Sequence, residues 1–245
     1  MPRSEGERAA REFRSQLGLG VEPISNLRQL LRERVDLVFV ERPLTAEIDG
    51  AYAFDEKLDK GFLYINARRI WTRRRFTMAH ELGHHVLEHR DRTDRSIDDL
   101  YDPVEVQANA FAAELLMPAS GLKQARSIAT REDVAELAGQ YLVSGKAMIV
   151  RLHSLGLIDE ALRRELNDQY DPRFYSRSLP ANSPDRSDTS STLLPADFSD
   201  AVVKLLQAGE ITRAAAIEAL DIPAAEADEL LPAGVSSRNR DREHP

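Results

Sequence analysis

Two histidines in one short segment are spaced so that both could hold a single metal ion. Residues 80–84 read His-Glu-Leu-Gly-His, with His80 and His84 four residues apart. On a helix, residues four apart lie on the same face, one turn above the other. The carboxylate of Glu81 can then reach a water molecule on the ion. Two ligands and a general base on one helix are what a zinc peptidase requires.

A third ligand is needed, because a catalytic zinc site takes three protein ligands and keeps one position for water. Glu105 is the preferred candidate, since it lies in the next predicted helix. It follows His84 by 21 residues, which leaves room for a loop and an antiparallel return. Asn109 lies one turn later on the same face. Its side chain could accept a hydrogen bond from the far ring nitrogen of His80 and so fix the tautomer of that ligand.

Glu105 also has a structural interpretation that needs no metal. As the third residue after Asp102, it could complete a capping box at the start of its helix. Glu114, on the same helix, is the alternative third ligand, although a solvated side chain is the simpler interpretation of that residue.

Other side chains near the motif are expected to have different roles. On a helix His85 points about 100° away from His84, and His89 lies five residues beyond it, so neither is expected to bind the ion. The oxyanion of a hydrolytic reaction needs a hydrogen-bond donor. The candidates for this role are Tyr52, Tyr101 and His85.

The chain before the motif predicts a small sheet. Apolar and β-branched residues cluster at 35–40, 48–54 and 62–65, and three short strands in sequence favour an antiparallel meander. The motif helix is then expected to begin with Thr72 as its N-cap and to end near Glu88.

Gly83 lies inside this helix, where glycine costs about 1 kcal/mol relative to alanine. The close approach of another backbone would explain its presence. The alanine-rich segment that starts at Glu105 predicts a partner helix, in which Ala108 and Ala112 offer a face of small residues. The five arginines between positions 68 and 75 are expected on a solvated surface.

The C-terminal half is expected to be mainly helical. Apolar spacing around a turn at 142–144 resembles a helix-turn-helix, and a later stretch rich in Pro, Ser and Asp indicates a linker. The predicted fold is α+β: a small antiparallel three-stranded sheet packed on the HExxH helix and a second ligand helix, followed by helical regions. The predicted parts are a zinc metallopeptidase core (1–125), a helix-turn-helix-like region (126–170), a flexible linker (171–192), a small helical domain (193–232) and a disordered tail (233–245).

Composition restricts the class of protein. The chain has 245 residues, 42% of them hydrophobic, and a net charge of −8, which argues against a generally basic nucleic-acid binder. It contains no cysteine, so a metal site must use histidines and carboxylates. The charged N-terminal segment lacks the apolar core of a signal peptide, and no run of about 18 apolar residues predicts a membrane span. A cytoplasmic protein without a membrane partner is expected.

Two stretches, Arg75–His85 and Glu105–Pro118, together resemble the ImmA/IrrE family of bacterial metallopeptidases. The resemblance covers about residues 20–160. It implies a gluzincin-like site with one Zn²⁺ per chain held by His80, His84 and Glu105, and Glu81 as the base that assists attack of metal-bound water. It also implies a regulatory endopeptidase whose protein substrate is a helix-turn-helix transcriptional repressor, so that cleavage releases a stress or mobile-element response. Mn²⁺ and Fe²⁺ are compatible with the same ligands.

A second hypothesis belongs to a different class of protein. The helix-turn-helix pattern and the C-terminal helical segment would suit a DNA-binding or antitoxin-like regulator with a structural or vestigial metal site. Residues 131–160 carry three basic and five acidic side chains, a net charge of −2, which is poor for a phosphate-binding surface. DNA binding is therefore the less favoured alternative, and this region is expected to pack on the core or to contact the substrate protein.

Overall fold

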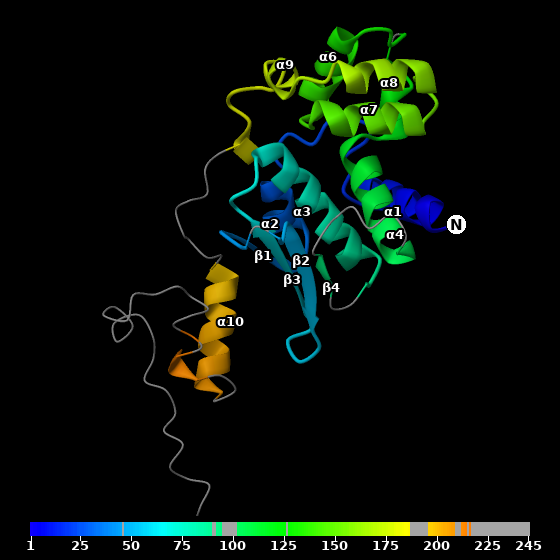
Figure 1. The fold of residues 1–245 in the computed structure, drawn as a ribbon. Coiled ribbons are helices and arrows are strands. Elements are labelled where there is room, and N and C mark those ends of the chain that lie inside the picture. Colours follow the sequence, from blue (N-terminus) through cyan, green and yellow to red (C-terminus); the bar gives the residue numbers. More distant parts are fainter. Residues whose placement is uncertain are drawn as a thin grey trace, which may run out of the picture. The chain divides into compact units, whose positions relative to one another are not determined.

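The computed structural model describes residues 1–45, 47–89, 92–94, 102–125, 127–186, 196–208, 212–214 and 216. The chain divides into two compact units, residues 1–191 and 192–245. The elements of the first unit (Figure 1) are α1 Pro2–Gln16, α2 Leu27–Arg34, β1 Leu37–Arg42, β2 Gly50–Asp55, β3 Lys60–Asn66, α3 Trp71–Val86, β4 Arg92–Asp94, α4 Pro103–Leu116, α5 Ala119–Leu122, α6 Arg131–Tyr141, α7 Gly145–Ser154, α8 Glu160–Asp168, α9 Pro172–Ser176 and the 3₁₀ turn η1 Pro184–Arg186.

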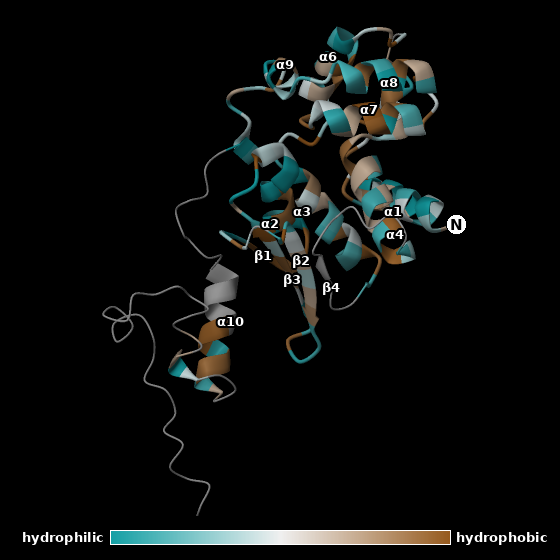
Figure 2. Cartoon of the chain, in the orientation of Figure 1, coloured by the Kyte–Doolittle hydropathy of each residue, from teal (hydrophilic) through white to brown (hydrophobic). Residues whose placement is uncertain are grey.

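The first unit has the predicted α+β class. Helix α3 packs on β2 and β3, α4 packs on α3, and α1 packs on α4. Apolar residues concentrate on the strands, whereas α8 is mainly hydrophilic (Figure 2). The core lies between these layers and includes Phe39 and Leu63 from the sheet, Leu82 from α3 and Phe111 from α4.

The sheet differs from the predicted antiparallel meander of three strands. Its order is β1-β3-β2-β4, with β1 parallel to β3 and with β2 antiparallel to both β3 and β4. A short turn joins β2 to β3 as a hairpin, whereas the longer connection after β1 lets that strand pair on the far side of β3. The four consecutive residues Leu37–Val40 are all buried, as expected of a parallel strand covered on both faces.

The HExxH helix begins earlier than predicted. Ile70 occupies the N-cap position of α3 without a side-chain cap, and Thr72 is the second residue of the helix. The prediction of Thr72 as N-cap is therefore wrong. The turn before the helix is instead held by Asn66, whose side chain accepts the backbone N–H of Arg68 and of Leu44.

Gly83 allows α3 and α4 to approach closely, as the sequence predicted. A Cβ added to Gly83 would lie 3.2 Å from the Cα of Ala108 and 3.1 Å from Cδ1 of Phe111. Ala108 is thus part of the contact, but Phe111 takes the place expected for Ala112. The contact brings the HExxH motif against the start of α4.

A second close approach joins α1 to α4. A Cβ at Gly6 would lie 2.1 Å from the carbonyl oxygen of Gln107, a backbone atom. We expect Gly6→Ala to lower the free energy of unfolding by about 1–3 kcal/mol, because the two helices would have to separate. At an unobstructed helix position the same change stabilises by roughly 1 kcal/mol, so the sign of the effect tests the contact. Urea denaturation followed by circular dichroism measures it, and unchanged or increased stability would contradict the prediction.

The helix-turn-helix-like pair consists of α6 and α7. Thr130 and Asp133 form a capping box at the start of α6, Leu142 ends that helix in the left-handed conformation, and the side chain of Ser144 caps α7. The pair packs on the rest of the first unit through Arg151. This buried guanidinium donates to Glu7 of α1 and to Glu114 of α4.

The prediction of a flexible linker over residues 171–192 is wrong for the part that the structure describes. Tyr175 in α9 is buried and lies against Gly145 at the start of α7. Further along, Asp185 is completely buried and forms an ion pair with Arg75 of α3. These tertiary contacts of Tyr175 and Asp185 could not be predicted from the polar composition of the stretch.

The described part of the second unit contains α10, Ala196–Gln207, with Val202 and Leu206 buried. Most of the predicted helical domain (193–232) and the whole predicted tail (233–245) lie outside the described residues, so these assignments stay predictions. Among the described residues, no helix is long and apolar enough to cross a membrane.

Candidate metal centre

Three predicted ligands from two helices converge in the first unit. Each of His80, His84 and Glu105 offers one ligand atom, and these atoms all lie within 4.8 Å of one another. All three side chains are buried. The packing of α3 on α4 around Gly83 brings Glu105 to the histidine pair. The structure therefore brings together the three residues that the sequence offered as ligands.

The spacing of the donor atoms suits a tetrahedral metal ion. Nε2 of His80 lies 3.1 Å from Nε2 of His84 and 3.2 Å from Oε2 of Glu105, and Nε2 of His84 lies 3.6 Å from Oε1 of Glu105. Ligands about 2.0–2.1 Å from a tetrahedral zinc ion would be separated by about 3.3 Å. Two imidazoles and one carboxylate also form a common catalytic ligand set for zinc.

Glu105 faces the histidines from the beginning of α4. The cap of this helix is Asp102, whose side chain accepts the backbone N–H of Val104. The metal-site geometry therefore favours the ligand interpretation of Glu105 over a role limited to capping. The alternative ligand, Glu114, is directed elsewhere: it is buried against Arg151.

Asn109 lies where a hydrogen-bond partner for the His80 ring was predicted. Its Oδ1 is 3.1 Å from Nδ1 of His80. Because an amide oxygen only accepts hydrogen bonds, Nδ1 carries the proton and the lone pair of Nε2 points to the centre of the cluster. The residue thus supports the tautomer that a metal ligand needs.

Glu81, next to the ligand His80 in the sequence, is completely buried. Its position depends on β2, because a Cβ at Gly50 would come within 2.7 Å of Oε1 of Glu81. Because Gly50 has no side chain, β2 leaves space for the carboxylate of Glu81 at this position.

The sequence did not predict that the side chain of His89 contacts the ligand His84. Its Nδ1 lies 3.1 Å from Nδ1 of His84, and its Nε2 lies 2.9 Å from Oε1 of Gln107. The prediction assumed a helix continuing to Glu88, but α3 ends at Val86, and Glu88 has a positive φ of 57°.

The end of α3 explains how His89 returns to the cluster. The backbone N–H of His89 bonds to the carbonyl of His84, and that of Glu88 to the carbonyl of His85. This pair of bonds is a Schellman motif, which normally places glycine at the left-handed position. Because glutamate occupies that position here, the sequence did not predict the turn.

Two of the three candidate oxyanion donors lie together. The hydroxyl of Tyr52 is 3.1 Å from Nδ1 of His85, and burial lowers the pKa of His85, an effect that Asp36 partly opposes. Tyr101 lies outside the described residues. The choice of oxyanion donor stays a prediction.

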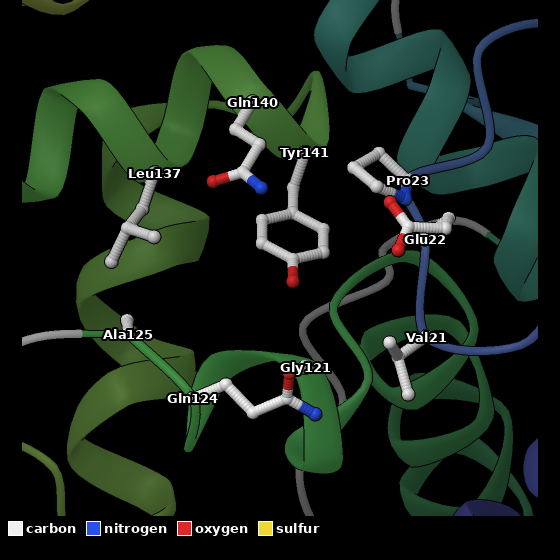
Figure 3. A pocket seen from close by; sticks show the side chains of 9 residues that line it. All are labelled: Val21, Glu22, Pro23, Gly121, Gln124, Ala125, Leu137, Gln140 and Tyr141. Carbon is white, nitrogen blue, oxygen red and sulfur yellow. The ribbon is translucent and has the colours of Figure 1, made fainter.

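A separate pocket of about 180 Å³ lies between α5, α6 and the loop before α2. Figure 3 shows the hydroxyl of Tyr141 and the amides of Gln124 and Gln140 around it. Burial raises the pKa of Tyr141. None of the three clustered metal-ligand candidates lines this pocket, so it is distinct from the metal centre.

A helix with an HExxH motif, packed on a second helix that offers a carboxylate, defines a metallopeptidase-like domain. Residues 32–153 match the IrrE N-terminal-like domain of the Peptidase M78 family, and through this domain the chain belongs to the ImmA/IrrE group. It is also similar to "Uncharacterized immunity region protein 2" of Bacillus phage phi105, with 35% identity over 98 residues. The match covers 38% of this chain and about 60% of the length of that relative.

Proposed function

We propose that this protein is a zinc-dependent endopeptidase with a regulatory role. The observation that carries the proposal is the convergence of His80, His84 and Glu105, at donor separations that suit a tetrahedral ion. Membership of a peptidase family supports the same conclusion. One Zn²⁺ per chain is proposed, and Mn²⁺ or Fe²⁺ are the alternatives that metal analysis distinguishes.

In the proposed reaction, His80, His84 and Glu105 hold the ion. The bound metal would polarise the peptide carbonyl and lower the pKa of water. Glu81, adjacent to the ligands, accepts the proton of the attacking water and delivers it to the leaving nitrogen. Asn109 keeps His80 in the required tautomer. Because Glu81 is buried, the proposed proton transfer would take place away from bulk solvent.

We propose a helix-turn-helix transcriptional repressor as the substrate. This follows from the resemblance of the two motif stretches to the ImmA/IrrE family, and the name of the phage relative, an immunity region protein, agrees with it. The most direct test is whether this protein cleaves a small helix-turn-helix repressor encoded beside it.

DNA binding by α6 and α7 has less structural support. In DNA-reading pairs, residues near the start of the second helix contact the bases. Here Tyr175 lies against Gly145 at that position, and Arg151 is buried in ion pairs. These contacts favour a packing role for the pair.

Loss of the third ligand tests the proposed centre. We expect Glu105→Ala to lose stoichiometric zinc and with it cleavage of the repressor, because two histidines alone leave the ion incompletely coordinated. Elemental analysis of the purified protein measures its zinc content. Gel electrophoresis of the protein mixed with the repressor measures cleavage. Glu12→Ala, an exposed change on α1, is the control. Full zinc content in Glu105→Ala would exclude Glu105 as a ligand, and a zinc-loaded unaltered protein that leaves the repressor intact would reject this substrate.

A further inference from the structure

We propose that Glu5, Gln107 and His89 are positioning residues that hold His84 in the tautomer able to bind the metal. The inference rests on the proposed metal centre but not on peptidase activity. Its basis is an unbroken series of hydrogen bonds from the exposed side chain of Glu5 to the buried ring of His84.

The series contains three contacts across three segments of the chain. Nε2 of Gln107 donates to Oε2 of Glu5 at 2.7 Å. Oε1 of Gln107 lies 2.9 Å from Nε2 of His89, and Nδ1 of His89 lies 3.1 Å from Nδ1 of His84. Glu5 belongs to α1, Gln107 to α4, and His89 to the turn that follows α3.

The chemistry of the two ends gives the series one direction. A carboxylate only accepts hydrogen bonds, so Glu5 orients the amide of Gln107 with its NH₂ outward and its oxygen toward His89. Nε2 of His89 must then carry the proton. In a neutral imidazole the other nitrogen is an acceptor, so Nδ1 of His89 accepts a proton from Nδ1 of His84. The lone pair of His84 is left on Nε2, which faces His80 and Glu105.

The fold holds the ends of this series in place. Gly6 lets α1 come so close to α4 that its backbone meets the carbonyl of Gln107, and the neighbouring Glu5 therefore reaches the side chain of Gln107. The Schellman turn after α3 folds His89 back under His84. Helix α4 thus orients both histidine ligands: His80 directly through Asn109, and His84 through Gln107 and His89.

The decisive variant reverses the direction of the hydrogen bonds from the surface. In Glu5→Lys a donor replaces the acceptor, so the Gln107 amide turns and presents its NH₂ to His89. The proton of His89 then moves to Nδ1, and His84 must accept at Nδ1 and carry its own proton on Nε2. We expect the zinc dissociation constant to rise about 10–100-fold, the range seen when outer partners of metal ligands are altered.

Three further comparisons separate the effect of this hydrogen-bond series from Glu5 to His84, here called the relay, from general effects of charge. Glu12→Lys makes the same change of charge on the exposed surface of α1 and should leave zinc affinity unchanged. Combining Glu5→Lys with Gln107→Glu restores a carboxylate that accepts from both Lys and His89, so affinity should return. In a His89→Asn background, Oδ1 replaces Nδ1 as acceptor for His84, and Glu5→Lys should then have no effect.

Zinc affinity is measured by competition with a chromophoric chelator, and circular dichroism confirms that each variant is folded. Long-range ¹H–¹⁵N spectra of the zinc-loaded protein should show His89 protonated at Nε2 and His84 at Nδ1. Equal zinc affinity of Glu5→Lys and Glu12→Lys, or His89 protonated at Nδ1, would overturn the relay and leave the metal centre intact. Failure of the unaltered protein to bind zinc would overturn both the relay and the proposed function.

Discussion

Glu81→Gln is expected to reduce peptide hydrolysis by about 10²–10⁴-fold, the usual contribution of a general acid–base group, while the protein keeps its zinc. Glutamine has the shape of glutamate but cannot take a proton from water at neutral pH. Because Glu81 is not one of the three clustered ligands, the ion should remain bound. The loss should appear in kcat rather than in the affinity for the protein substrate.

Retention of the metal must be measured on the same samples as activity. Elemental analysis gives the zinc content, and cleavage of the repressor with time gives the rate. Glu56→Gln makes the same chemical change at an exposed position in the hairpin between β2 and β3 and should leave both quantities unaltered. Full activity of zinc-loaded Glu81→Gln would remove Glu81 from the mechanism, whereas loss of zinc would mean that it supports the ligands.

Asp185→Asn is expected to lower the free energy of unfolding by about 3–5 kcal/mol, the range for breaking one partner of a buried ion pair. Asp185 forms an ion pair with Arg75, and both side chains are completely buried. Burial lowers the pKa of Arg75, an effect that the charge of Asp185 opposes. Without this partner, a guanidinium would remain in the interior without its compensating charge.

The same carboxylate also supports the start of α2. Its oxygens accept the backbone N–H groups of Leu27 and Arg28 at 3.0 and 3.2 Å, where negative charge is favoured by the helix dipole. Asparagine can replace one of these bonds but not the charge.

Urea denaturation of the unaltered protein and of Asp185→Asn measures the loss in the free energy of unfolding. Glu160→Gln weakens the hydrogen bonds that Glu160 accepts from Arg163 and Arg164 at a partly exposed position and should have a much smaller effect. A comparably small effect of Asp185→Asn would show that residues 183–186 are not anchored to the core. A large effect would establish that the stretch after α9 is part of the folded unit.

Much of the metal centre could be predicted because it depends on local periodicity. The four-residue spacing of His80 and His84 requires only that the segment is helical, and Asn109 follows Glu105 by the same spacing. Gly83 indicated a close helix contact, and this contact is where α4 meets α3. The α+β class followed from the apolar runs before the motif.

The strand order and the burial of the arginine-rich segment could not be predicted from local periodicity. The pairing of β1 with β3 depends on contacts between segments separated along the chain. The arginines between 68 and 75 were expected on a solvated surface, yet Arg74 and Arg75 are buried in ion pairs with Glu41 and Asp185. A charged side chain is buried only where a distant partner compensates its charge, and composition does not identify that partner.

The sequence by itself determined which residues could hold a metal, because ligand type and helical spacing are local properties. Only the tertiary structure decided that Glu105 reaches the histidine pair while Glu114 does not, since this depends on how α4 lies against α3. It also decided the position of His89, because a left-handed turn at Glu88 returns that ring to His84. The physical reason is the same in each case: hydrogen bonds and ion pairs between distant segments are set by packing, which no single stretch of sequence specifies.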